Sequence, residues 1–212
     1  MAQVGDVVPG SPPGEPGDDA AAERRRLMRA AFAVMRRNGF LGASVQDILD
    51  EAGLSTRAFY RQFRSKDDLL LAMFRSDTDA VAATLAARVA DAPSAPDALD
   101  AWVDEMLSLC FDARRARRVV TFRSAARQAA GYDAEEVRLR RALTAPLVET
   151  LERGAADGSF PTTDPVPDAD AIFGLVWNLA GPAVRQSASM DRARAKANLL
   201  RFCRPALGMT PA

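Results

Sequence analysis

The fold of this 212-residue chain is decided by residues 44–70, whose sequence is SVQDILDEAGLSTRAFYRQFRSKDDLL. The stretch predicts two short helices joined by a tight turn. Ser44 begins the first helix in a capping box that Asp47 completes, Gly53 supplies the positive φ of the turn, and Ser55 caps the second helix. Apolar residues recur at helical spacing in both segments, so we predict a helix-turn-helix unit.

The flanking segments predict a chain built of helices alone. A helical pattern begins after Asp19 and ends at Gly39, and a long helix runs from the Ser65 cap to about Ala90. No stretch shows the sustained alternation that strands require. Five more helices are expected at about 97–112, 113–128, 134–156, 168–187 and 191–207. We therefore predict an all-α protein of about nine helices, with a small N-terminal three-helix domain and a larger C-terminal bundle.

The formal net charge of zero hides an uneven distribution of charge. Residues 1–19 carry four acids and no base, whereas residues 20–75 carry eleven Lys or Arg against six Asp or Glu. A basic segment on a neutral body is typical of a module that binds a polyanion such as nucleic acid. Residues 1–19 also hold four prolines and four glycines, and we expect a disordered arm there.

Composition excludes many kinds of chemistry. The chain has no histidine, which removes Ser-His-Asp and Cys-His hydrolysis, His-ligated zinc and a histidine pH switch. Cys110 and Cys203 are too few for a four-thiolate metal site. We find no glycine-rich phosphate loop, no signal peptide and no membrane span. The expectation is a cytoplasmic, soluble protein that is not an enzyme and uses neither cofactor nor metal.

The second helix of the helix-turn-helix is expected to present its outer side chains to a major groove. Thr56 and Arg57 would be exposed at its N-terminal end, with Gln46 nearby on the preceding helix. Arginine can bridge O6 and N7 of guanine, and glutamine can pair with N6 and N7 of adenine. An ordinary helical hairpin that binds no DNA fits the same periodicity.

The same stretch resembles the DNA-binding signature of the TetR family of bacterial transcriptional regulators. That signature reads T/S-x-x-x-I-A-x-x-A-G-V-S-x-x-x-x-Y-x-x-F-x-x-K-x-x-L. The residues that fill its positions here are Ser44, Ile48, Ala52, Gly53, Leu54, Ser55, Tyr60, Phe63, Lys66 and Leu69. Leu49 replaces a common alanine and Gln62 a common histidine. The motif covers roughly residues 20–70, and the rest is similar only in length and helix pattern.

The resemblance implies a homodimeric, ligand-responsive repressor that binds a palindromic operator in double-stranded DNA. It divides the chain into an arm (1–19), a DNA-binding domain (20–66) and a ligand-binding and dimerisation domain (67–212). The implied base readers are Gln46, Thr56, Arg57 and Ala58. The expected phosphate contacts are Ser44, Tyr60, Arg61, Gln62 and Lys66. Arg61 is included because of its positive charge and its position on the second helix.

The family would place an effector pocket among the helices between about residues 70 and 185. The candidate lining residues are Trp102, Met106, Cys110, Phe111, Phe122, Arg123 and Trp177. They suit an apolar or aromatic effector whose acidic group, if present, could pair with a buried arginine. For Trp102, Met106 and Trp177, the alternative is that they are ordinary core residues. The last two helices would form the dimer interface through Phe173, Val176, Ala180, Leu199 and Phe202. The rival function is an all-α small-molecule-binding protein without DNA recognition.

Overall fold

The computed structural model describes residues 16–184 and 190–209, apart from the side chains of some helical residues, Phe122 among them. All regular secondary structure in this part of the chain is helical, as predicted. The nine helices are α1 (Pro16–Gly42), α2 (Val45–Ala52), α3 (Thr56–Gln62), α4 (Lys66–Ala90), α5 (Ala95–Phe111), α6 (Ala113–Ala126), α7 (Tyr132–Asp157), α8 (Pro165–Val184) and α9 (Arg192–Ala206). None of these helices has an apolar run long enough to cross a lipid bilayer.

The chain divides between Leu69 and Leu70 into two compact parts, called here the N-terminal unit and the C-terminal unit. Residues 1–15 of the expected arm lie outside the described residues. The first helix begins at Pro16, earlier than the sequence predicted, because proline is tolerated at the first helical position, where its missing N–H would be unpaired anyway. Its regular conformation breaks at Gly39 (φ 71°, ψ 168°), where its end was predicted.

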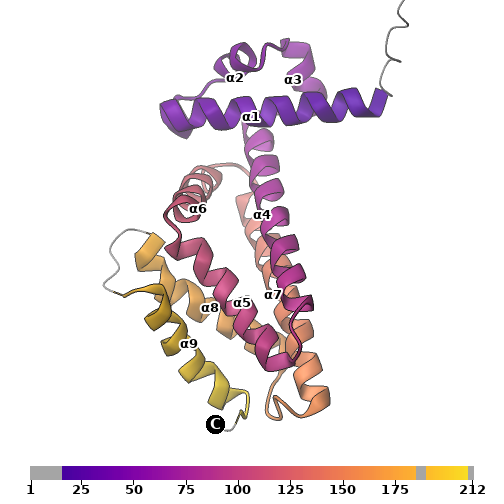
Figure 1. The fold of residues 1–212 in the computed structure, drawn as a ribbon. Coiled ribbons are helices and arrows are strands. Elements are labelled where there is room, and N and C mark those ends of the chain that lie inside the picture. Colours follow the sequence, from indigo (N-terminus) through magenta and orange to yellow (C-terminus); the bar gives the residue numbers. More distant parts are fainter. Residues whose placement is uncertain (1–15, 185–189, 210–212) are drawn as a thin grey trace, which may run out of the picture. The chain divides into compact units, whose positions relative to one another are not determined.

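In the N-terminal unit, α2 and α3 pack on one side of α1 (Figure 1). The predicted capping box is present: Ser44 Oγ accepts from Asp47 N at 3.1 Å, and the Asp47 carboxylate accepts from Ser44 N at 2.9 Å. Gly53 ends α2 in the left-handed conformation (φ 59°, ψ 43°), and Ser55 caps α3. These local signals end α2 and begin α3.

The start of α4 has the Ser65 cap that the sequence predicted and one further contact. Ser65 Oγ accepts from Asp68 N at 3.1 Å as expected. The Asp68 carboxylate accepts from the backbone N–H of Arg64 at 2.9 Å, one residue before the cap. The aspartate therefore also holds the short link between α3 and α4.

In the C-terminal unit, α5 runs between α7 and α8, and α9 lies along α8 (Figure 1). Leu99, Trp102 and Met106 on α5 are fully buried, and the indole Nε1 of Trp102 donates to Leu143 O at 2.9 Å. Helix α5 carries apolar residues on several of its faces because neighbouring helices pack against it on several sides.

One carboxylate lies inside the C-terminal unit. Glu105 is 2% exposed and accepts from Arg88 on α4 and from Arg115 on α6, each at 2.5 Å. Burial alone would raise the pKa of Glu105, but the two guanidinium groups outweigh it and hold the pKa below its usual range. The buried charge therefore ties three helices together.

Candidate nucleic-acid interface and internal cavity

Helix α3 buries one face and exposes the other. Phe59 and Phe63 are 0% and 1% exposed, and their ring centroids lie 5.9 Å apart. These anchors fix the helix on α1, and the opposite face carries Thr56, Arg57 and Tyr60, all exposed. Gln46 on α2 and the N-cap Ser44 are exposed as well. The structure thus brings the expected base-reading side chains, apart from one, to the surface.

The exception is Ala58, which the sequence analysis assigned to the groove-facing side. Its side chain is only 4% exposed. Position 58 lies next to Phe59 and one turn before Gln62, so it belongs to the face that packs against the rest of the unit. The assignment of Ala58 to base contact was wrong.

Three of the expected phosphate contacts already have partners within the N-terminal unit. Arg61 Nη2 donates to both carboxylate oxygens of Glu23, at 2.5 and 2.6 Å. Gln62 Nε2 donates to Ala20 O at 3.1 Å, and Lys66 Nζ donates to Ala43 O at 2.9 Å. The hydrogen bond from Arg61 holds the pKa of Glu23 below its usual range. These side chains fasten α3 and the start of α4 to α1 and the segment after it.

Sequence reasoning missed the residues of α1 that hold the helix-turn-helix. The guanidinium of Arg24 lies 4.4 Å from the ring centroid of Phe63, and its Nη1 donates to Gln62 O at 3.1 Å. Arg26 covers the turn, because a Cβ built on Gly53 would lie 2.9 Å from Arg26 Nη2. No local signal could have identified these contacts, which join residues almost thirty or forty positions apart.

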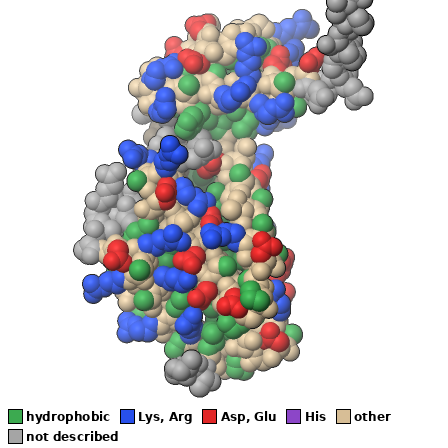
Figure 2. Space-filling view, in the orientation of Figure 1, with side chains coloured by type: hydrophobic (Ala, Val, Ile, Leu, Met, Phe, Trp, Pro, Cys, Tyr) green, Lys and Arg blue, Asp and Glu red, His purple; other side chains and the backbone are tan. Residues whose placement is uncertain are grey.

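Cationic side chains gather on the visible face of the N-terminal unit (Figure 2). Several exposed arginines of this unit form no ion pair with any described residue. They are Arg25, Arg26, Arg29, Arg36, Arg57 and Arg64. Because their charge is not neutralised within the unit, they are available to an external polyanion.

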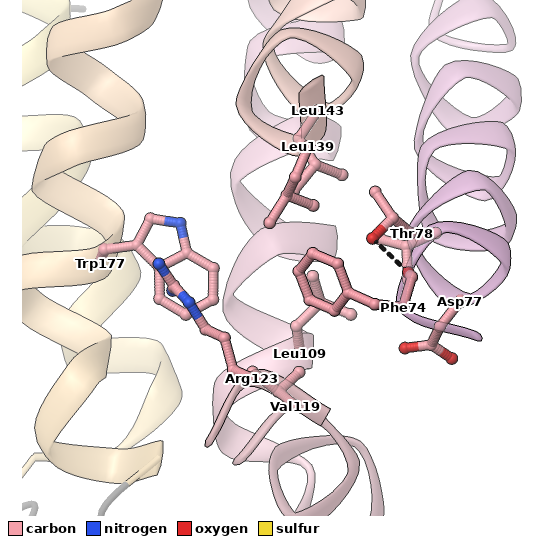
Figure 3. Close-up of a pocket in the computed structure, with 10 residues that line it drawn as sticks. Phe74, Asp77, Thr78, Leu109, Val119, Arg123, Leu139, Leu143 and Trp177 are labelled. Carbon is pink, nitrogen blue, oxygen red and sulfur yellow. Dashed lines mark hydrogen bonds between the residues drawn. The ribbon is translucent and has the colours of Figure 1, made fainter. Parts of the chain in front are cut away.

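The C-terminal unit contains a cavity of about 50 Å³ between helices α4, α5, α6, α7 and α8 (Figure 3). Its lining residues are Phe74, Asp77, Thr78, Val81, Leu109, Val119, Arg123, Leu139, Leu143 and Trp177. Two of the predicted pocket residues, Arg123 and Trp177, are among them.

The other predicted pocket residues do not line this cavity. Trp102, Met106 and Cys110 are buried in the core, and Phe111 packs against it. The Phe122 side chain lies outside the described part of the structure. Burial raises the pKa of the Cys110 thiol to about 12, so this cysteine is a packing residue without thiolate character at neutral pH. The sequence analysis missed the lining residues on α4 and α7. Apolar residues that line a cavity have the same helical spacing as apolar residues of the core, so the pattern does not distinguish them.

Arg123 is the one cationic residue among the described residues that line the cavity, and Asp77 and Thr78 are the other polar residues there. The guanidinium of Arg123 lies 4.8 Å from the ring centroid of Trp177, and its Nη2 donates to Glu136 Oε1 at 2.5 Å. Tyr132 Oη lies 3.4 Å from Arg123 Nε and donates to Glu136 at 3.3 Å. Partial burial would raise the pKa of Glu136, but Arg123 outweighs it and lowers the pKa. The indole Nε1–H of Trp177 is buried and has no acceptor among the described residues.

Most of the residues proposed for a dimer interface lie inside the C-terminal unit. Phe173, Val176, Ala180 and Leu199 are at most 5% exposed and belong to its own core, so their assignment to the interface was wrong. An apolar stripe on a helix marks a buried face and does not say whether the partner is the same chain or another. Phe202 on α9 is 58% exposed, and Leu175 on α8, which the prediction missed, is 37% exposed.

Comparison with known proteins agrees with this architecture. Residues 27–73 match the family described as bacterial regulatory proteins, tetR family. The HTH-type transcriptional repressor Rv1474c of Mycobacterium tuberculosis is 33% identical over 97 residues, covering 43% of this chain and 51% of that protein. The chain thus spans about half the length of this curated relative.

Solved structures share most of the fold. A TetR transcription regulator from Haloarcula marismortui has a TM-score of 0.71 at 18% identity, covering 87% of this chain and 98% of the other. The transcriptional regulator FadR from Bacillus subtilis, in complex with stearoyl-CoA, has a TM-score of 0.68 at 17% identity, covering 86% and 98%. At these identities the likeness is one of fold.

Proposed function

Because residues 27–73 match the tetR family of bacterial regulatory proteins, we propose that the chain is a ligand-responsive transcriptional repressor of that family. It binds a palindromic operator as a homodimer in the bacterial cytoplasm. The observation that carries the proposal is the exposed face of α3, which a buried pair of phenylalanines holds in place. The unneutralised arginines of the N-terminal unit and the name of the mycobacterial relative support it.

In this proposal, the N-terminal end of α3 enters the major groove. Arg57 is the main base reader, since an exposed, unpaired guanidinium can bridge O6 and N7 of guanine. Thr56 and Gln46 contact neighbouring bases, and Tyr60 and Ser44 contact phosphates. Arg61, Gln62 and Lys66 act mainly by positioning α3, because each already holds a partner in the N-terminal unit.

The dimer forms through the outer faces of α8 and α9. Leu175 and Phe202 supply exposed apolar area there, and Ala171 and Gly174 on α8 allow a second helix to approach closely. A two-fold dimer presents two recognition helices to half-sites one DNA turn apart, about 34–36 Å.

The effector binds in the cavity of the C-terminal unit and acts through α4. Phe74, Thr78 and Val81 on α4 line the cavity, and the same helix begins at Lys66, which is bonded to Ala43 in the N-terminal unit. A ligand that moves α4 therefore changes the setting of the DNA-binding helices. Coupling of this kind is typically about 1–3 kcal/mol. The stearoyl-CoA held by FadR supports the idea that the fold accommodates a small molecule.

A second function, small-molecule binding without DNA recognition, is favoured by one observation. Ala58 is buried, and Arg61, Gln62 and Lys66 are engaged internally, which leaves fewer free side chains for DNA than the signature implies.

Fluorescence anisotropy with the DNA upstream of the protein's own gene, at several salt concentrations, distinguishes the two functions. A repressor binds this fragment more tightly than a scrambled one, and its affinity falls steeply with salt. Equal, weak binding to both fragments would favour the second function. The matched variants are Arg57→Ala, which should lose the preference, and Arg36→Ala, which removes the same charge from the solvent-facing side of α1 and should keep it.

A further inference from the structure

We propose that the effector is an apolar acid, and that Glu136 is the internal anion that its carboxylate replaces on Arg123. This inference rests on the proposed function and names the class of molecule that the cavity admits. It follows from three features of the cavity: a cation that is already paired, a buried donor that is not, and walls that are mostly apolar, with Asp77 and Thr78 as the other polar residues.

The first feature is the position of Arg123. Its guanidinium lies over the indole of Trp177, on the α6 and α8 side of the cavity (Figure 3). Stacking on the ring and the hydrogen bond with Tyr132 keep the guanidinium there whichever anion it binds. A planar guanidinium offers parallel donors that match a carboxylate. Arg123 is therefore an anion-binding side chain that stays in place while one carboxylate replaces another.

The second feature is the unequal exposure of the two partners. The side chain of Glu136 is 40% exposed and that of Arg123 is 27% exposed. When an incoming carboxylate takes its place, Glu136 can turn into water at little desolvation cost, whereas removing the anion without replacement would leave a partly buried cation unpaired. Exchange of one carboxylate for another conserves the charge of the site. An incoming amine would instead compete with Arg123 for the same carboxylate.

The third feature is the donor on Trp177. A buried N–H without an acceptor loses its hydrogen bonds to water and gains none in return, and structures rarely leave one. In this cavity the donor belongs to the same indole on which Arg123 stacks, so one ligand head group meets both residues. The head group that satisfies a guanidinium and an indole N–H together has at least two acceptor oxygens, as a carboxylate does.

The remaining walls define the body of the ligand. Leu109, Val119, Leu139 and Leu143 are apolar, Phe74 presents a ring from α4, and Asp77 and Thr78 add polar groups on the α4 side (Figure 3). The present volume of about 50 Å³ holds only a few water molecules. An organic acid enters only when lining side chains move apart, and Phe74 and Thr78 couple that movement to α4.

Calorimetric titration of the full-length, DNA-free protein tests the head group. The probes are three acids with phenylpropyl, cyclohexylpropyl and straight eight-carbon bodies, each with its amide and its amine. We expect at least one acid to bind, about tenfold or more tightly than its own amide, and the matching amine to bind more weakly still. Binding by no acid, or an amide or amine that binds as tightly as its acid, would overturn the proposal.

The Trp177 donor has its own readout. The chain has two tryptophans, and the Nε1–H of Trp102 already donates to Leu143 O. An amide-correlation NMR spectrum therefore shows two indole signals, which Trp177→Phe assigns. Binding of the acid should shift the Trp177 signal downfield and leave that of Trp102 nearly unchanged. A Trp177 signal that does not move at saturating acid would contradict the assigned contact.

Two glutamates on α7 test the exchange. Glu136→Gln removes the charge that competes with the acid for Arg123 and should raise the affinity for the acid about tenfold. The control, Glu149→Gln, removes an exposed charge that has no partner among the described residues. It should leave the affinity for the acid unchanged. Equal affinities in both variants would refute the exchange. Arg123→Lys, which keeps the charge but not the parallel donors, should weaken binding about tenfold. Since these titrations use no DNA, they can fail while operator binding holds, and the reverse.

Discussion

The two units of this protein use arginine in different ways. In the N-terminal unit, six exposed arginines have no ionic partner among the described residues. In the C-terminal unit, arginines connect helices: Arg88 and Arg115 meet on the buried Glu105, and Arg123 pairs with Glu136. On the visible face of that unit, blue and red side chains interleave (Figure 2). The difference teaches that substitution of an unpaired arginine in the first unit should affect DNA binding, whereas substitution of a paired arginine in the second should affect folding.

The largest expected effect comes from breaking the buried network of the C-terminal unit. Glu105→Ala leaves two guanidinium groups without their anion and should lower the free energy of unfolding by about 3 kcal/mol. Urea denaturation measures this, with the exposed Glu149→Ala as the control. If both substitutions cost the same small amount, the buried carboxylate does not organise the unit.

The N-terminal unit should respond in the opposite way. Arg57→Ala should weaken operator binding by about 1–3 kcal/mol and change the free energy of unfolding by less than about 0.5 kcal/mol. The reason is that Arg57 is exposed and makes no contact that stabilises the fold. Anisotropy and urea denaturation of the same preparation give both values. A large loss of stability would remove the distinction between the units.

The pair of Arg61 and Glu23 sharpens the comparison, because it is, like Arg37 with Glu51, an internal ion pair in the unit that also holds the six unpaired arginines. Glu23→Gln should cost less than about 1 kcal/mol of stability, since Arg61 is 55% exposed. It should also release Arg61 to contact a phosphate. The slope of log affinity against log salt concentration should then become steeper by about one, which corresponds to one more released counterion. A shallower slope would instead mean that Glu23 is needed to orient α3.

The smallest effect is a pH dependence. The pKa of Glu105 is lower in the folded protein than in the unfolded chain, so its stabilisation is complete above the ordinary glutamate range near 4.3 and is lost as pH falls through the folded pKa. Between pH 7 and pH 3, the free energy of unfolding of the unmodified protein should therefore fall more than that of Glu105→Gln. Parallel losses would indicate that other carboxylates dominate acid unfolding.

The features predicted correctly from the sequence are local ones. The Ser44 cap, the Gly53 turn and the Ser55 cap each involve residues within four positions, so the pattern of the chain contains the whole interaction. For the same reason the nine helices were expected close to their observed ranges.

The errors arise where a helical face has more than one possible partner. The apolar spacing of Phe173 and Val176 marks a buried face, and only the tertiary structure shows that their own chain covers it. Likewise, the cavity joins Phe74 to residues on α7 some 65 positions away, and the pairing of Arg61 with Glu23 spans 38 positions. Such contacts depend on how helices pack and leave no mark in the local pattern.

Selection of binding sites from a pool of random DNA tests the central claim, recognition by α3, most directly. The unmodified protein should recover a palindrome whose half-sites lie about one DNA turn apart. Arg57→Ala should recover the same palindrome with the preference relaxed at one position in each half-site. Recovery of no common site by the unmodified protein, or of identical sites by both proteins, would contradict the assignment of Arg57 on α3 as the base reader.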